Sequence, residues 1–218
     1  MEQISKVITV EEHFMSEKVN GEYQKLLEKK NLTLAQKAKA NFIQQFVAKG
    51  EITEVGEKRL EFMETHGIDC QILSYGNNSP SYLDPKQAVV LCQMANEELA
   101  GYCKQYPGNF YGFAVLPVGD TGAALTELER AVKTLGLKGI IFNGAYQESY
   151  FDEDRFFPIF EMAQELKVPV MLHPGEVPTE VAKTYYQGSW PVAVANVFAG
   201  HGIGWHYDAW VQYMRMIL

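Results

Sequence analysis

Glu11 and His13 lie two residues apart at the end of a short apolar stretch, ITVEEHF, which covers residues 8–14. β-Branched side chains fill the first half of this stretch, so the pattern predicts a buried β-strand. Because side chains two positions apart on an extended strand project to the same side, the carboxylate and the imidazole are expected to be neighbours. A carboxylate beside an imidazole provides half of the ligand set of a divalent metal ion.

A second apolar stretch, VPVMLHP at residues 168–174, has the same organisation and places His173 at its end. If both stretches are parallel strands of one sheet, Glu11, His13 and His173 share the C-terminal edge of that sheet. This edge is where α/β folds build their active sites. Taken singly, however, each residue is more simply explained as a hydrogen-bonded polar group at a strand end.

The segments between these two stretches alternate between strand and helix patterns. Short runs rich in Val, Ile and Leu alternate with amphipathic segments, which is typical of a parallel α/β architecture. Asp84 and Pro85 mark one helix start, and Gly67 marks a helix end. The predicted strands cover residues 68–74, 110–115, 138–142 and 168–172, and the predicted helices cover residues 54–66, 85–106, 120–135 and 152–166.

Two regions are predicted to lie over the C-terminal edge of the sheet. Residues 15–50 are rich in lysine and have partial helical periodicity, which indicates a helical insertion. That insertion is either a lid, an oligomer contact or a solvated surface segment. The Gly-, Asn- and Ser-rich loop after residue 74 carries Asn77, and Asn143 follows the fourth strand. Both asparagines are predicted to contact a substrate.

The last part of the chain offers less specific signals. Residues 207–218 predict a helix with Trp210, Tyr213 and Ile217 on one face. His201 and His206 lie in a glycine-containing stretch, HGIGWH, and we expect a loop at the rim of a pocket rather than metal ligands. Trp190 and Trp205 either line an aromatic pocket or pack in the core, and we expect core packing for both.

Length and composition exclude several classes of protein. A chain of 218 residues suggests one domain, and a net charge of -8 argues against nucleic acid as a partner. Three widely spaced cysteines without a CxxC pair indicate reduced thiols in a cytoplasmic protein. We found no secretory signal and no apolar stretch long enough to cross a membrane.

Five stretches together carry a resemblance to a known family: ITVEEHF, HGIDCQILS, PGNFYGFAVLPVGD, GLKGIIFNG and VPVMLHP. The sequence resembles the amidohydrolase-2 family, in the branch of γ-resorcylate and aminocarboxymuconate semialdehyde decarboxylases. The resemblance implies a (β/α)8 TIM barrel with one divalent metal ion, zinc or manganese, at its C-terminal face. By the same resemblance Glu11, His13 and His173 are the ligands, and the substrate is a small aromatic or cyclic carboxylic acid that is decarboxylated or hydrolysed.

The sequence also departs from the family pattern. The family has a functional histidine after its sixth strand and a functional aspartate after its eighth, and neither has a counterpart here. The resemblance therefore implies about five of the eight βα units, with the C-terminal third of the barrel lacking. Five strands leave two open sheet edges, which a homo-oligomer would cover.

Three functional hypotheses remain at this point. The chain is either a metal-dependent enzyme of this family or a catalytically inactive, truncated remnant or fragment of one. A nucleotide- or flavin-binding domain ranks last, because neither GxGxxG nor GxxxxGKS/T occurs in the sequence.

Overall fold

The computed structural model describes residues 6–28, 52–76 and 79–218. Its centre is a five-stranded sheet in which the strands follow one another in chain order. All four neighbouring pairs are parallel. The strands are β1 (Ile8–Phe14), β2 (Cys70–Tyr75), β3 (Phe110–Ala114), β4 (Gly139–Asn143) and β5 (Val170–His173). A strand order that never reverses is the order of a barrel and not of a doubly wound sheet. The predicted α/β fold, a partial TIM barrel of five strands, is confirmed.

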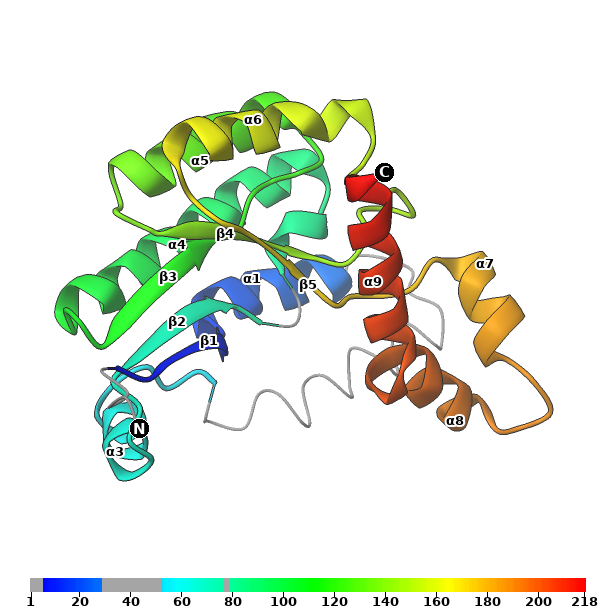
Figure 1. The fold of residues 1–218 in the computed structure, drawn as a ribbon, viewed down its shortest axis with the longest axis horizontal. Helices are drawn as coiled ribbons and strands as arrows, with labels where there is room; N and C mark the ends of the chain where they lie inside the picture. The colour runs from blue at the N-terminus through cyan, green and yellow to red at the C-terminus, as the bar shows by residue number, and fades with distance from the viewer. Residues whose placement is uncertain (1–5, 29–51, 77–78) are drawn as a thin grey trace.

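Helices connect the strands and cover one side of the sheet. Figure 1 shows α4, α5 and α6 along that side, with α9 beside β5. The connecting helices are α1 (Glu17–Glu28), α3 (Glu57–Thr65), α4 (Pro85–Gln105), α5 (Thr121–Lys133) and α6 (Phe157–Leu166). After β5 come α7 (Thr179–Val181), α8 (Val192–Val197) and α9 (Gly204–Ile217). No helix within the described ranges combines the length and hydropathy needed to cross a bilayer.

The helix boundaries follow from local sequence signals. Asp120 precedes α5, and its carboxylate accepts a hydrogen bond from the Ala123 amide at 3.0 Å. Pro85 opens α4 behind Asp84 at the N-cap position, as expected from its fixed φ angle. Gly67, with φ of +67°, follows the end of α3. The predicted helix at residues 152–166 begins later, with a short 3-10 turn at Asp154–Phe156 before α6.

A buried polar network joins α4 and α5 to the end of β3. Asn96 of α4 donates to the Val115 carbonyl and accepts from the Val115 amide, both at 2.9 Å. It also donates to Glu127 of α5 at 2.7 Å, and Arg130 pairs with the second Glu127 oxygen at 2.8 Å. Because every buried polar group here has a partner, the network fixes α4 and α5 against the end of β3.

The region after β5 differs from the sequence-based expectations. The loop predicted around His201 and His206 is wrong, because Phe198–Gly202 forms a π-helical turn and α9 begins at Gly204. Gly200 has non-helical backbone angles, and a Cβ at Gly204 would collide with the Ala199 carbonyl. The glycines therefore permit a kink between two helical segments instead of preventing helix formation.

The aromatic residues of this region are less buried than predicted. Trp190 is exposed, so its expected place in the core is wrong, while Trp205 is half-buried against the His201 ring. In α9 the predicted apolar face points outward: Trp210 and Ile217 are 61% and 75% exposed. The side chains that α9 buries are instead Asp208, Ala209 and Gln212.

Two other expectations fall partly or wholly outside the described residues. The helical insertion predicted for residues 15–50 is represented by α1, whereas residues 29–51 lie outside the described ranges. Asn77, a predicted substrate contact, also lies outside them.

Candidate metal centre

Glu11 and His13 of β1 meet His173 of β5 at the C-terminal end of the sheet. The Nε2 atoms of His13 and His173 are 3.1 Å apart, and Glu11 Oε1 lies 3.2 Å from His173 Nε2. One ligand atom from each residue lies within 4.8 Å of the other two. β1 and β5 are the two edges of the sheet, so only the curl of the sheet brings these side chains together.

A bulge in β1 precedes His13. Thr9 pairs with Gln71 and Glu12 pairs with Leu73, so β1 advances three residues while β2 advances two. One extra residue in a strand bends it locally and re-aims the side chains beyond it. Arg59 of α3 supports the strand after the bulge, because its Nη2 donates to the His13 carbonyl at 2.9 Å.

A close backbone contact holds the end of β5 against that of β4. Asn143 and His173 are register partners, and the Gly144 amide donates to the His173 carbonyl at 2.9 Å. A Cβ on Gly175 would lie 2.5 Å from Gly144 Cα and 2.6 Å from the Asn143 carbonyl oxygen. Only glycine fits at residue 175 with the two loops this close.

The donor set fits a divalent cation. His173 Nδ1 lies 2.6 Å from the Pro174 carbonyl, which can only accept, so in neutral His173 the lone pair is on Nε2. That lone pair faces the Glu11 carboxylate and the His13 ring. Two ligands that each lie about 2.0–2.2 Å from a shared ion are themselves about 3 Å apart. A cation between the Nε2 atoms of the two histidines and the Glu11 carboxylate removes the repulsion between their lone pairs. Two nitrogen ligands with one oxygen ligand suit zinc or manganese.

The electrostatic environment favours the neutral, ligating form of His13. Burial lowers the pKa of His13, and the neighbouring His173 lowers it further. The negative charge of Glu11, a hydrogen bond with Ser74 and the negative charge of Glu12 each raise the pKa and so oppose this shift. A lowered pKa keeps the imidazole unprotonated at neutral pH, and a metal ion binds only the unprotonated ring.

The other predicted site residues are not among these three ligands. Asn143 is half-buried beside His173 in the register, and its backbone N–H donates to the Tyr82 hydroxyl at 2.7 Å. Within the described part of the chain, the Glu11 group alone brings together three potential metal ligands, so His201 and His206 belong to no such group. No role was predicted from the sequence for Ser74, whose Oγ lies 3.0 Å from His13 Nδ1. The signal that could have identified Ser74 is its position near the end of β2, the strand next to β1.

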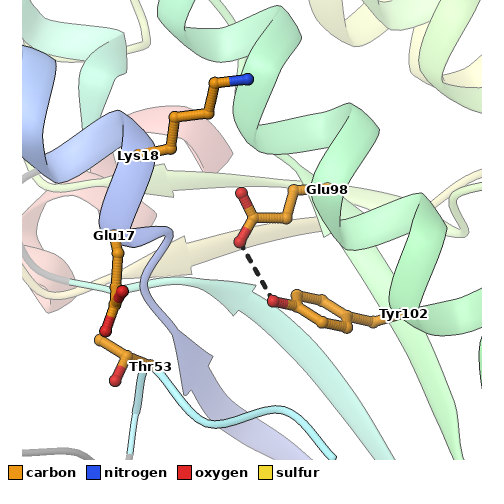
Figure 2. Close-up of a pocket in the computed structure, with 5 residues that line it drawn as sticks. All are labelled: Glu17, Lys18, Thr53, Glu98 and Tyr102. Atoms are coloured by element: carbon orange, nitrogen blue, oxygen red, sulfur yellow. Dashed lines mark hydrogen bonds between the residues drawn. The ribbon is translucent and has the colours of Figure 1, made fainter.

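A cavity of about 500 Å³ lies elsewhere, between α1 and α4 (Figure 2). Its lining residues are Glu17, Lys18, Thr53, Glu98 and Tyr102. Glu98 accepts hydrogen bonds from Tyr102 at 3.1 Å and from Ser16 at 2.6 Å. Because both carboxylate oxygens of Glu98 have protein partners and no residue of the metal centre lines this cavity, we regard Glu98 as structural.

The fold is that of a known class of proteins. Residues 46–211, more than half of the chain, match the family model described as Amidohydrolase, and the chain belongs to this amidohydrolase family. The matched range includes His173 and begins after Glu11 and His13.

Individual relatives are decarboxylases. The γ-resorcylate decarboxylase of Rhizobium radiobacter is 33% identical over 157 residues, which are 68% of this chain and 47% of the relative. Decarboxylase orsB of Emericella nidulans is 32% identical over 168 residues, or 76% of this chain and 49% of the relative. The chain thus spans about half the length of the curated relatives that it matches.

A solved structure extends the similarity to the whole described fold. The 5-carboxyvanillate decarboxylase of Novosphingobium aromaticivorans has a TM-score of 0.84 and 26% identity, over 99% of this chain and 62% of its own. That structure contains manganese and 3-methoxy-4-hydroxy-5-nitrobenzoic acid.

Proposed function

We propose that this chain carries the metal-binding part of an active site that decarboxylates a small aromatic carboxylic acid. The observation that carries the proposal is the convergence of Glu11, His13 and His173 at the C-terminal end of a partial barrel. The relatives named above are decarboxylases, which supports carbon dioxide release over hydrolysis. Manganese in the related structure supports manganese as the ion, with zinc as the alternative.

The residues of the chain have distinct roles in this proposal. Glu11, His13 and His173 hold the ion. Asn143, next to His173 in the register, offers its side-chain amide to an anionic oxygen of the substrate. When bound, a divalent ion supplies a Lewis acid that fixes a carboxylate and an adjacent oxygen. The lowered pKa of His13 keeps its ring available for the ion at neutral pH.

The reaction also needs a proton donor, because hydrogen replaces the departing carboxylate on the ring. Among the described residues, no fourth His, Cys, Asp or Glu joins the group. We therefore expect this polypeptide on its own to be a poor catalyst. The competing proposal is an inactive chain that retains only the three ligands.

A homo-oligomer is proposed as the assembly. Ile8 and Val10 of β1 and Tyr111 of β3 are exposed apolar side chains on the open sheet, and Trp210 and Ile217 are exposed on α9. A second copy over these surfaces would remove them from water. Sedimentation velocity at increasing concentration tests this, and a monomer throughout would contradict it.

An activity assay tests the function. The chain is incubated with manganese and a panel of hydroxybenzoic acids, and released carbon dioxide is measured for the wild type, His173→Ala and His201→Ala. The enzyme proposal predicts weak release that His173→Ala abolishes and His201→Ala retains, because His201 lies outside the ligand group. Absence of release from a wild type that binds manganese would instead support the inactive alternative.

A further inference from the structure

Ser74 connects the second strand of the sheet to the proposed metal centre. It lies in β2 as the register partner of His13 and is fully buried. Its Oγ is 3.0 Å from His13 Nδ1, the ring nitrogen that faces away from Glu11 and His173. No other side chain of the described residues hydrogen-bonds to this nitrogen.

The partners of Ser74 determine which atom carries the hydrogen. The hydroxyl has a single hydrogen, and Oγ donates to the Glu12 carbonyl at 3.4 Å. With that hydrogen engaged, Oγ can only accept from His13, so Nδ1 of His13 carries the ring hydrogen. The lone pair of neutral His13 is then on Nε2, which lies 3.1 Å from His173 Nε2.

The backbone around His13 leaves the ring little freedom to change this arrangement. Arg59 holds the His13 carbonyl, and a Cβ on Gly76 would lie 3.3 Å from His13 Cβ. With the strand fixed on both sides, the hydrogen bond to Ser74 determines the rotation of the ring. His173 achieves the same result through the Pro174 carbonyl, which no side-chain substitution removes.

We propose that Ser74 is a positioning residue: by accepting the Nδ1 hydrogen of His13, it holds the Nε2 lone pair toward the metal centre. This inference rests on the proposed function, because it assigns a role beside the same three ligands. Partners that orient a ligating histidine commonly contribute about 10–100-fold to metal affinity. Ser74 acts through His13 and does not itself touch the ion.

Metal affinity is the first readout. Manganese and zinc are titrated calorimetrically into metal-free wild type, Ser74→Ala and Ser74→Thr, with Ser81→Ala as a control that removes a buried hydroxyl elsewhere. We expect Ser74→Ala to weaken binding about tenfold or more, whereas Ser74→Thr and Ser81→Ala stay close to the wild type. Threonine keeps the hydroxyl and suits a strand. Unchanged affinity in a folded Ser74→Ala would overturn the proposal.

The second readout needs no metal. In metal-free protein with ¹⁵N-labelled histidine, the ring shifts of His13 report which nitrogen carries the hydrogen. We expect Nδ1–H in the wild type and a mixture of tautomers in Ser74→Ala. An Nε2–H ring in the wild type would overturn the role of Ser74 whether or not metal binds. A wild type that binds no metal but has the Nδ1–H ring would contradict the proposed function and leave the role of Ser74 supported.

Discussion

At the scale of single residues, the proposed metal centre depends on its three ligand side chains and also on Gly175, where no side chain fits. The ring of His173 meets the carboxylate of Glu11 and the ring of His13 at the end of β5, and β5 ends against β4 without an intervening Cβ. Gly175 lies against Gly144 Cα and the Asn143 carbonyl, which are backbone atoms that cannot rotate away.

Gly175→Ala tests this contact. The added methyl group forces the loops after β4 and β5 apart, so we expect a loss of about 1–3 kcal/mol in the free energy of unfolding and weaker manganese binding. Gly101→Ala is the matched control, because nothing lies within 4 Å of its added Cβ in α4. It should instead stabilise by about 0.5–1 kcal/mol through helix propensity. Chemical denaturation measures both, and equal effects of the two substitutions would contradict the account.

At the scale of elements, α9 is attached to the rest of the molecule by polar contacts. Tyr150 donates to Asp208 Oδ1 at 2.6 Å, and Arg215 binds Asp152 at 2.7 Å. Asp208 Oδ2 is buried and has no hydrogen-bond partner among the described residues. Burial raises the pKa of Asp208, the Tyr150 hydrogen bond lowers it, and Glu148 raises it, with a net upward shift.

The sign of this shift predicts a pH dependence. Because the folded-state pKa of Asp208 lies above its unfolded value, the protonated side chain favours folding, and this contribution is lost as the pH rises through the folded pKa. Asp208→Asn, which stays neutral, should therefore be more stable than the wild type at neutral pH. Each unit of pKa shift corresponds to about 1.4 kcal/mol.

Urea unfolding of the two proteins between neutral and acidic pH checks this expectation. The difference in unfolding free energy should shrink as the pH falls, because wild-type Asp208 becomes protonated. Asp154→Asn, at an exposed position, controls for the general effect of removing a carboxylate. A constant difference across the pH range would contradict the assignment to Asp208.

The sequence predicted the positions of the helices and strands better than it predicted which side of each one is buried. All five strands were visible as short apolar runs, and the shared edge of Glu11, His13 and His173 followed from their places at strand ends. The bulge in β1 had no glycine or proline to mark it. The orientation of α9 could not be predicted from the sequence, because an apolar stripe on a helix ordinarily faces inward. In the structure α9 instead buries Asp208 and Gln212. Ser74 was overlooked because a serine at a strand end has no distinctive pattern.

At the scale of the whole molecule, the ligands of the proposed centre come from opposite edges of an incomplete barrel. β1 and β5 have no hydrogen-bonded partner strand on their outer sides among the described residues, yet their C-terminal ends meet at His13 and His173. Metal binding would therefore cross-link the first and last strands of the sheet. We expect an ion that binds the folded state to raise the melting temperature in a concentration-dependent manner.

The most direct test is the metal content of the purified chain after incubation with manganese or zinc and removal of excess ion. The wild type is compared with the Glu11→Ala, His13→Ala double variant and with His206→Ala, which removes an exposed histidine outside the group. We predict one ion per wild-type chain and per His206→Ala chain, and none in the double variant. A folded wild type that retains no ion, or a double variant that retains as much as the wild type, would contradict the proposed metal centre.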